Sequence, residues 1–517
     1  MTFDETHAYA PAARRFMSLG TLPAEVDNFE RRDSSAAIPF FPLAILGALG
    51  RLAGSLEAAF IWADAVFPAL AFALMYTVTD GIVERFEFRL ALAWATLLIP
   101  FGPRNFLWLG YDALLAAPDF TRTPQPEVTF PLVLLAVVAL ARMFRASTDR
   151  CAILPGLLSA LIVYAYYFYA VAWGMTVVML LVLSALWGKW RVARRTTIVT
   201  GIMIVGAIPY MLHAARGRSQ GGQSFLLARM GAHTHNPNVL WIVVCALGFL
   251  LMWRFGRRLL DGREHRARSL VLSLVLLAGV AGLNFHVVSG YDAQHSHFWN
   301  RLILPVGLLL VGAWGLGTLE SVVRPAVWLP RVALAVMACM VLNAGVRQAY
   351  VGRHIAELQR ASRPEIELLC WAREALPTGS VIGTVDPELI LLIPAIAADF
   401  SYVPTGIRSL TPSDEIVDRY YEMASLLGMS EADVAAAAKR RAHVQPSQLL
   451  LVLSAGGPPD AFAQQYGPFH RSPGWSGRKL DFVVSDAGAA LSPVLLERFP
   501  RAHVVHVNRR YSLVDVR

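Results

Sequence analysis

Residues 151–187 have the sequence CAILPGLLSALIVYAYYFYAVAWGMTVVMLLVLSALW, which carries no charged side chain. A transmembrane helix needs about 20 predominantly apolar residues, so this stretch is too long for one crossing. It predicts two membrane helices. We place the turn between them near Tyr167–Trp173, because tyrosine and tryptophan favour the boundary between lipid and water. The stretch therefore predicts a polytopic α-helical membrane protein.

The composition of the whole chain agrees with this prediction. Hydrophobic residues make up 56% and charged residues only 16%, which is too apolar for a soluble domain of this length. The net charge of +9 does not indicate nucleic-acid binding, because Lys and Arg gather in short loops between apolar blocks. We predict about ten spans, at 57–79, 88–101, 128–144, 151–169, 170–187, 197–213, 238–254, 269–288, 300–318 and 331–347. The cysteines Cys151, Cys245, Cys339 and Cys370 lack metal or redox spacing and are expected to pack.

Three loops rich in Lys and Arg set the expected orientation. They lie at 142–150, 189–195 and 254–268, and the number of spans between them places all three on one side, which the positive-inside rule makes cytoplasmic. The opposite, external side then receives 1–56, 102–127, 214–237, 289–299 and the tail from 348. Met1–Pro11 has no apolar segment that would carry 1–56 across, so either this segment crosses unaided or, as we favour, a preceding span is missing from this sequence.

The tail changes character. Charged residues, prolines and short β-rich runs predict a soluble α/β domain over 348–517, after a membrane domain over 1–347 whose external first loop, 1–56, carries amphipathic helices. The tail contains no glycine-rich nucleotide-binding motif between a strand and a helix. We predict strands at Ser380–Val385, Leu449–Ser454, Phe482–Ser485, Val504–Val507 and Tyr511–Val516, and helices at Pro364–Ala375 and Ser413–Leu427.

The first segment carries a resemblance to a known family. Asp4-Glu5-Thr6-His7-Ala8-Tyr9, a helix-like stretch and then Ile38-Pro39-Phe40-Phe41-Pro42-Leu43 resemble the first outer loop of GT-C glycosyltransferases. The resemblance covers the membrane half and implies transfer of a sugar from a polyprenyl-phosphate donor to a glycan, lipid or protein acceptor. In that family an acidic residue of this loop is the catalytic base or orients the acceptor, and Asp4 and Glu5 match its position. Adjacent residues on a helix point about 100° apart, so we favour one of them, Asp4. The tail resembles the external C-terminal domains of such enzymes.

Two further outer loops offer substrate-binding residues. Sugar transfer from a lipid phosphate needs a carboxylate to take a proton and cations to stabilise the departing phosphate. In the loop 118–127, Arg122 is expected to hold a phosphate, and Asp119 or Glu127 to bind the acceptor or a metal. The alternative for this loop is a proline-stiffened connection in which Glu127 caps the following helix.

The loop 292–301 holds the densest polar chemistry. We expect Asp292, His295, His297 and Arg301 to recognise phosphate or sugar, with Arg301 paired to a lipid phosphate. The alternative is an interfacial anchor formed by Phe298, Trp299 and Arg301. His-x-His alone is a weak metal signal, so we predict no metal site and no cofactor, although a divalent cation is chemically compatible.

Asp64, the clearest charge within a span, supports a rival class. Intramembrane acids are usually functional or paired, so a transporter or flippase, or a non-catalytic membrane scaffold, stays open as an alternative. A single such acid and the absence of an internal repeat favour the glycosyltransferase. The short loops between spans and a tail without glycosylation sequons indicate a bacterial inner membrane, with the tail periplasmic.

Overall fold

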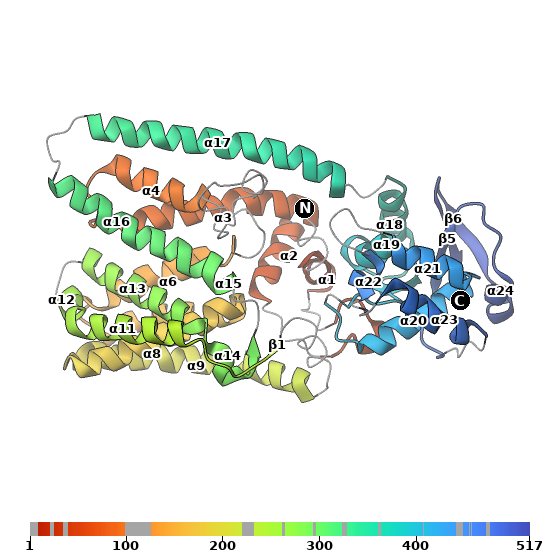
Figure 1. The fold of residues 1–517 in the computed structure, drawn as a ribbon, viewed down its shortest axis with the longest axis horizontal. Coiled ribbons are helices and arrows are strands. Elements are labelled where there is room, and N and C mark those ends of the chain that lie inside the picture. Colours follow the sequence, from red (N-terminus) through yellow and green to blue (C-terminus); the bar gives the residue numbers. More distant parts are fainter. Residues whose placement is uncertain are drawn as a thin grey trace.

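A helical bundle and an α/β domain lie side by side along the long axis of the molecule (Figure 1). The structure is a computed structural model. It describes residues 9–20, 25–34, 40–98, 126–219, 232–260, 264–292, 296–322, 328–359, 363–406, 408–440, 448–453, 455, 458–471 and 476–517.

The bundle consists of long apolar helices. Its long helices are α3 (Leu56–Thr79), α4 (Phe86–Leu98), α6 (Phe130–Met143), α7 (Ile153–Ala165), α8 (Tyr167–Leu186), α9 (Trp190–Ser219), α11 (Val239–Phe255), α13 (Glu264–Gly282), α16 (Leu304–Val322) and α17 (Trp328–Gln359). Short elements are α12 (Arg257–Leu260), β1 (Ala232–His233), α14 (Phe285–Ser289), β2 (Tyr291–Asp292), α15 (Ser296–Phe298) and the π-helical turn η5 (Trp299–Ile303). Within the described ranges, α3, α8, α9, α13 and the continuous η5–α16 are long and apolar enough to cross a membrane. The predicted polytopic helical protein is confirmed, while the number of about ten spans stays a prediction.

The break inside the uncharged stretch occurs where the aromatic residues begin. Tyr166 has an extended backbone, with φ −161° and ψ 125°, so α7 ends at Ala165 and α8 begins at Tyr167. An extended residue cannot continue the i to i−4 hydrogen-bond pattern of a helix. The prediction of two helices is confirmed, but the position of the turn, predicted near 167–173, is wrong: the break lies at Tyr166, and residues 167–173 begin α8.

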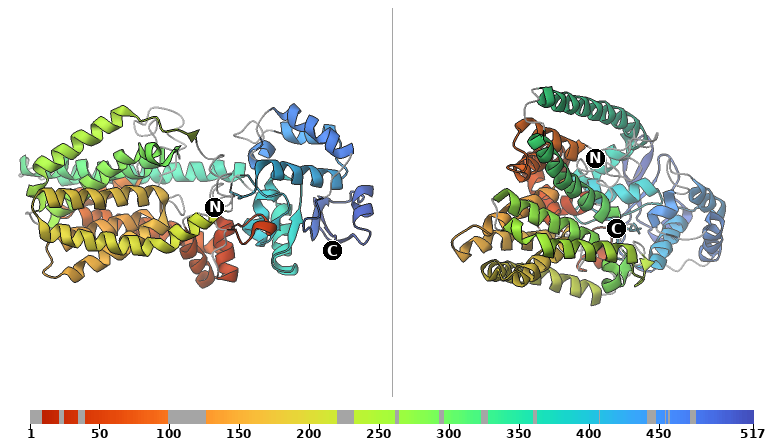
Figure 2. Two further views of the ribbon diagram at one scale, coloured as in Figure 1. Left: turned by 90° about the horizontal axis from the view of Figure 1, so that it is seen from below. Right: turned by 60° about the vertical axis from the view of Figure 1, so that its left-hand side comes forward.

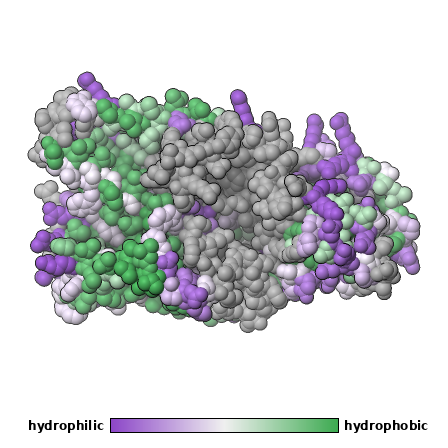
Figure 3. All heavy atoms as spheres, viewed as in Figure 1, coloured by the Kyte–Doolittle hydropathy of each residue, from purple (hydrophilic) through white to green (hydrophobic). Residues whose placement is uncertain are grey.

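The outward faces of the bundle are apolar. The helix α11 has no buried residue, and Leu240, Leu247 and Leu251 on it are more than half exposed. On the face shown in Figure 3, hydrophobic residues gather over the bundle, whereas hydrophilic residues gather at its far end and over the α/β domain. Such a large apolar surface suits contact with lipid rather than water.

The three Arg-rich loops meet at the end of the bundle that is distant from the α/β domain. Arg195, fully buried, donates to Asp149 at 3.1 Å and to the backbone oxygens of Met143 and Ala146, each at 2.9 Å. Arg142 lies 3.4 Å from Glu264, which connects the first loop with the third. The prediction that these loops share one side therefore agrees with their positions, and which face of the membrane they occupy stays a prediction.

The α/β domain is built on a five-stranded mixed sheet with the order β4-β3-β5-β7-β6. The strands are β3 (Val381–Gly383), β4 (Phe400–Ser401), β5 (Phe482–Asp486), β6 (His503–Val507) and β7 (Tyr511–Asp515). β3 runs parallel to β4 and β5, while β7 runs antiparallel to β5 and β6. The helices are α18 (Arg363–Ala375), α19 (Pro387–Leu392), the π-helical turn η6 (Ile393–Ala397), α20 (Ser413–Leu426), α21 (Glu431–Lys439), α22 (Gln448–Leu453), α23 (Pro459–Arg471) and α24 (Pro493–Arg498). The predicted C-terminal α/β region is confirmed.

Both faces of this sheet are covered by apolar side chains. Along β5, Val483 belongs to the hydrophobic cluster formed with α20 to α23, whereas Phe482 and Val484 belong to the cluster formed with α18 and η6. This alternation follows from the period of two in a β-strand. The sheet is therefore the central layer of three.

One predicted strand is wrong. Residues 449–454 were expected to form a strand, but Gln448–Leu453 is the helix α22. Leu449, Val452 and Leu453 are fully or almost fully buried and have the spacing of one helix face, and a short apolar run fits a buried helix as well as a strand. The other four predicted strands and both predicted helices are confirmed, with ends that differ by a few residues, and β4, α21 and α23 are additional elements.

The N-terminal segment does not pack with the bundle alone. It forms α1 (Ala10–Leu19), the 3-10 turn η2 (Phe29–Arg31) and α2 (Phe41–Ala53). Between α1 and η2, Asp27 is fully buried and accepts two hydrogen bonds from Arg408, at 2.8 and 2.7 Å. The backbone N–H of Ser401, in β4, donates to the backbone oxygen of Asp27 at 3.0 Å. The segment is thus joined to the edge of the C-terminal sheet.

Neighbouring polar side chains extend this joint. Glu25 accepts from the backbone N–H of Leu410 at 2.5 Å and from the Ser409 hydroxyl at 3.1 Å. The Asn28 amide donates to the Thr411 hydroxyl at 2.8 Å. These groups are buried and satisfied by one another, which is the condition under which burial of polar groups is tolerated. Residues 25–28 are therefore buried against the C-terminal domain, through contacts that join positions 383 and 384 residues apart in the sequence.

We predict that Arg408→Met destabilises the full-length protein strongly. Removal of one partner leaves the Asp27 carboxylate buried without its counter-charge, which costs about 3–5 kcal/mol. The melting temperature in detergent, measured by intrinsic fluorescence, should fall clearly below that of Arg32→Met, the same substitution at a partly exposed arginine whose partner Asp33 is 92% exposed. Adding Asp27→Asn to Arg408→Met should recover part of the loss. Equal melting temperatures for the Arg408 and Arg32 variants would contradict the structural importance of the buried pair.

Candidate functional site

The helix that follows the predicted acidic pair is fixed against the C-terminal domain. α1 begins at Ala10, and on it Arg14 donates to the backbone oxygen of Ala395 at 2.5 Å and pairs with Glu57 of α3. The Arg15 guanidinium lies 3.6 Å from the centre of the Phe400 ring. One helix is therefore held by both parts of the molecule. The predicted site residues Asp4, Glu5, Asp119, Arg122 and His295 lie outside the described residues.

A polar cluster lies at the end of the bundle that faces the C-terminal domain. Its centre is Arg301, in η5, which is 3% exposed and donates to the Tyr166 hydroxyl at 2.6 Å. His297 Nδ1 makes a second hydrogen bond to this hydroxyl at 2.7 Å. The Tyr169 hydroxyl donates to the Arg301 backbone oxygen at 2.9 Å. The structure therefore brings together two predicted residues, His297 and Arg301, and adds two tyrosines.

Aromatic rings surround the cluster. The Phe168 ring lies edge-on to His297, with 4.8 Å between the ring centres, and also to Phe298, at 5.0 Å. Aromatic rings therefore pack against His297, which shares the Tyr166 hydroxyl with the buried Arg301. A cation that is withdrawn from water attracts an anion more strongly than it would in water. Phe298 is almost fully buried, so it packs inside the bundle and does not anchor it at the lipid surface.

The first outer segment reaches the same end of the bundle. Phe40, which precedes α2, lies edge-on to Tyr164 of α7, with ring centres 5.3 Å apart. Tyr164 is two residues before Tyr166, and its hydroxyl donates to the backbone oxygen of Gly206 at 2.6 Å. In Figure 1 and in the left view of Figure 2, α1 and α2 lie between the bundle and the C-terminal domain. The contact between Phe40 and Tyr164 thus brings the first segment to the end of α7, next to Tyr166 of the cluster.

Two further predicted site residues, Glu127 and Asp292, lie in the segments that precede α6 and α15. Glu127 lies in the turn 126–129 that leads into α6 and is 1% exposed. The N-cap of α6 is Thr129, two residues after Glu127, so the alternative role of Glu127 near the N-terminus of this helix stays open. Asp292 belongs to β2, which pairs antiparallel with β1 through Ala232. Glu127 therefore precedes α6, whose Phe130 ring contacts the Tyr169 ring, and Asp292 precedes α15, which carries His297.

Two further histidines, His286 and His235, bond to the backbone in these connections. His286 Nε2 is hydrogen-bonded to the backbone oxygen of Asn236 at 2.9 Å, and His235 Nδ1 to that of Val287 at 3.0 Å. Over the part of the chain that the structure describes, no three His, Cys, Asp or Glu side chains gather as metal ligands do. Asp64 is exposed on α3 and does not point into the bundle interior.

Sequence reasoning missed the two tyrosines. Tyr166 and Tyr169 lie in an aromatic run that was interpreted only as an interfacial turn, because tyrosine is common at that depth. Their hydroxyls hold both the side chain and the backbone of Arg301.

Burial shifts the pKa values of several groups where the N-terminal segment meets the C-terminal domain. Burial, reinforced by the charge of Asp27, raises the pKa of Glu25 to about 7. Burial also raises the pKa of Asp399 to about 7, although the backbone N–H groups of Gly379 and Ser380 and the charge of Arg15 oppose it. Burial lowers the pKa of Arg15 to about 10. Two carboxyl groups beside the first segment therefore titrate near neutral pH.

Several solved structures are similar to this chain. ArnT from Cupriavidus metallidurans bound to undecaprenyl phosphate has 15% identity and a TM-score of 0.39, with 99% of this chain and 94% of that chain covered. The apo state of the same enzyme has 14% identity and a TM-score of 0.38, with 98% and 92% covered. The Archaeoglobus fulgidus oligosaccharyltransferase has 11% identity and a TM-score of 0.43, with 94% of this chain and 66% of that chain covered.

No protein-family model matches the chain, and no curated protein matches its sequence.

We predict that Asp399→Asn flattens the pH dependence of stability. A carboxyl whose pKa is raised by folding stabilises the fold fully below its ordinary pKa and loses that contribution as the pH rises through about 7. The wild-type protein should therefore lose on the order of 1–3 kcal/mol between pH 4 and pH 8, and the variant less, because the asparagine oxygen still accepts from Gly379 and Ser380. Melting temperatures across this pH range measure the effect.

Asp433→Asn is the matched control. Hydrogen bonds from Ser430 lower the pKa of Asp433, so its contribution is lost as the pH falls through the acidic range, which is the opposite direction. An Asp399→Asn protein that kept the wild-type slope between pH 4 and pH 8 would show that the buried carboxyl does not titrate there.

Proposed function

We propose that this protein is a membrane glycosyltransferase that moves a sugar from a polyprenyl-phosphate donor to a hydroxyl of an envelope glycan, lipid or protein acceptor. The observation that carries the proposal is the buried Arg301 guanidinium, held by Tyr166 and placed where apolar helices face the C-terminal domain. A lipid-linked phosphate needs this combination, because its isoprenoid chain lies against apolar helices while its headgroup lies near a cation.

Arg301 is proposed to bind the donor phosphate. Its guanidinium is always charged and presents several donors in a fixed plane, which suits phosphate oxygens. The hydrogen bond to Tyr166 fixes the guanidinium group of Arg301, and the hydrogen bond from Tyr169 fixes its backbone oxygen. Little reorganisation is therefore needed when charge develops on the leaving group. Arg122 is proposed as a second cation for the same phosphate.

Asp4 or Glu5 is proposed as the base. The carboxylate takes the proton of the acceptor hydroxyl, the acceptor oxygen forms a bond to the anomeric carbon, and the bond from that carbon to the phosphate oxygen breaks with its electron pair. Polyprenyl phosphate leaves, and the anomeric configuration is inverted. The anchoring of α1 by Arg14 and Arg15 supports this role, because a base must be held in position before the reaction.

The other polar residues of the outer loops are proposed to bind the sugar or the acceptor. They are Asp119, Glu127, Asp292, His295 and His297, and His297 is already positioned by Tyr166. No step in this scheme uses a metal ion. The external face of a bacterial inner membrane is the proposed location, since the Arg-rich loops gather at the opposite end of the bundle. The exposed position of Asp64 favours an enzyme over a transporter, whose intramembrane acids normally face the bundle interior.

We predict that Asp4→Asn and Glu5→Gln, measured separately, will show which of the two carboxylates is the catalytic base. Purified protein in lipid is supplied with radiolabelled polyprenyl-phosphate sugars and a fraction of envelope glycolipid and glycan as acceptor, and label that moves into the acceptor is counted. Loss of the general base should lower kcat by about 100- to 10,000-fold, while the other substitution has a smaller effect. Full turnover in both single variants and in the double variant would exclude a base at these positions.

We predict that Arg301→Lys and Arg301→Ala weaken donor use. Loss of charge-assisted hydrogen bonds costs about 1.5–3 kcal/mol, which corresponds to a donor kcat/KM about 10- to 100-fold lower. The acceptor KM should change little, and lysine should retain more activity than alanine. Arg150→Ala, at an exposed arginine near the opposite end of the bundle, is the control and should behave as wild type. A uniform loss for donor and acceptor would contradict a phosphate-binding role.

A further inference from the structure

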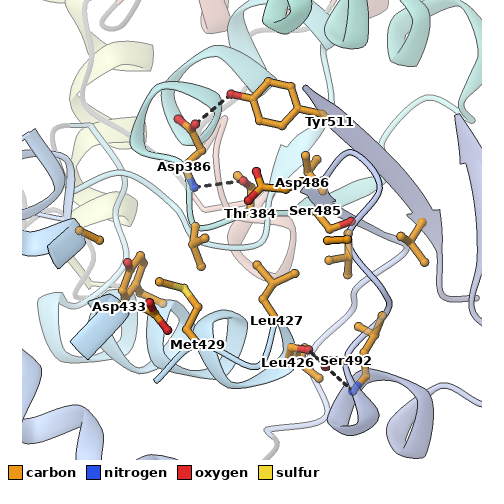
Figure 4. Close-up of a pocket in the computed structure, with 18 of the residues that line it drawn as sticks. Thr384, Asp386, Leu426, Leu427, Met429, Asp433, Ser485, Asp486, Ser492 and Tyr511 are labelled. Carbon is orange, nitrogen blue, oxygen red and sulfur yellow. Dashed lines mark hydrogen bonds between the residues drawn. The ribbon is translucent and has the colours of Figure 1, made fainter. Parts of the chain in front are cut away.

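The C-terminal domain contains a cavity of its own, with a volume of about 660 Å³. It lies between the strands β5 and β7 on one side and the helices α19, α20 and α21 on the other (Figure 4). Small-molecule sites are commonly about 300–1,000 Å³, so the cavity is large enough for a ligand. Its polar lining residues include Thr384, Asp386, Tyr420, Asp433, Ser485, Asp486 and Tyr511.

Two hydroxyl groups in the lining have no hydrogen-bond partner among the residues that the structure describes. Tyr420 is fully buried, and its hydroxyl is unsatisfied, as is the buried hydroxyl of Ser485. A buried polar group without a partner destabilises the fold, and such groups in native structures call for an explanation such as a bound molecule. The two residues belong to different elements, α20 and β5, and both line the same cavity.

Other polar groups around the cavity are already held in place. The Tyr511 hydroxyl donates to Asp386 at 3.0 Å, and the backbone N–H of Asp386 donates to the Thr384 hydroxyl at 3.1 Å, as Figure 4 shows. Asp386 also caps the N-terminus of α19. A site whose polar groups are fixed before binding loses little entropy when a ligand enters.

The charges of the lining select against anions. Four carboxylates border the cavity, from Asp386, Glu388, Asp433 and Asp486, against the two guanidinium groups of Arg440 and Arg510. Arg510 is paired with Glu365 at 2.9 Å, which reduces its availability. A phosphate or a nucleotide would therefore meet net negative charge.

The free hydroxyls and the apolar walls indicate the class of ligand. A hydroxyl both donates and accepts, so the natural partner for two unsatisfied hydroxyls is a ligand that carries hydroxyls itself. Leu426, Leu427 and Met429 form an apolar wall on the helical side, which suits the C–H faces of a sugar ring. We infer that this cavity binds a neutral saccharide of about one or two rings, at a site separate from the membrane cluster.

The inference does not depend on the glycosyl transfer proposed above, because binding can be measured without turnover. Full-length protein is kept in a detergent whose headgroup contains no sugar. The probes are glucose, N-acetylglucosamine, cellobiose and chitobiose, with glucose 6-phosphate as the charged counterpart, and binding is followed by saturation-transfer NMR and by titration. At least one neutral sugar should bind, and glucose 6-phosphate should bind more weakly than glucose.

Tyr420→Phe and Ser485→Ala test the two hydroxyls. Each should weaken binding about 10-fold, the effect of losing about 1.4 kcal/mol. Tyr421→Phe is the matched control, since the Tyr421 hydroxyl donates to the backbone oxygen of Phe462 at 2.6 Å and does not border the cavity. This control should lower the melting temperature and leave binding intact, whereas Tyr420→Phe should not lower the melting temperature, because it removes an unsatisfied group.

Ala489→Trp provides an independent test that leaves the interior unchanged. Ala489 is exposed and borders the cavity, so a tryptophan there should obstruct entry and abolish binding in a folded protein. Three results would each overturn the inference. The first is that no neutral sugar binds, and the second is that glucose 6-phosphate binds better than glucose. The third is that a protein carrying all three substitutions, Tyr420→Phe, Ser485→Ala and Ala489→Trp, binds sugar as the wild type does.

Discussion

The buried ion pair between Asp27 and Arg408 is the constraint on which the arrangement of the molecule depends. A carboxylate and a guanidinium that are both withdrawn from water are tolerated only together, because either alone would be a buried charge without compensation. Their two hydrogen bonds fix the N-terminal segment in the interior of the α/β domain. That segment continues into α2, which packs on the membrane helices through contacts such as that of Phe40 with Tyr164. One pair thus determines how the soluble and membrane parts face each other, and α1 lies between them.

The break at Tyr166 has a comparable double effect inside the bundle. The extended backbone at this residue ends α7 and starts α8 in a new direction, and the same residue supplies the hydroxyl that binds Arg301 and His297. A helix interior would have directed this side chain along a continuous helical face. Tyr166 therefore serves both the fold and the polar cluster. The position of the cluster in the bundle is fixed by the boundary between α7 and α8.

Much of the fold could be predicted from the sequence, because apolar blocks and charged loops depend on local composition. The Arg-rich loops and the two helices within 151–187 follow directly from the cost of placing charge or long loops in lipid. Arg301 and His297 were predicted as candidates from the chemistry of their side chains. Their partners Tyr166 and Tyr169 were not, since hydrogen bonds between distant helices leave no local pattern. The burial of Asp27 beside Arg408 could not be predicted either, because the sequence around Asp27 is that of an ordinary polar loop. The strand expected at 449–454 failed for a related reason: only tertiary packing decides between a buried strand and a buried helix.

The separation between Asp27 and Arg408, 381 residues along the chain, has a consequence for biosynthesis. Synthesis proceeds at about 5–20 residues per second, so roughly 20–80 seconds pass between the appearance of the two partners. During that interval the helices of the bundle can enter the membrane, while the N-terminal segment still lacks the domain that will enclose it. Its carboxylates then remain hydrated and hold the segment in water. Assembly of the two halves is therefore a late event, and a chain that stops before Arg408 would present an N-terminal segment without its partner.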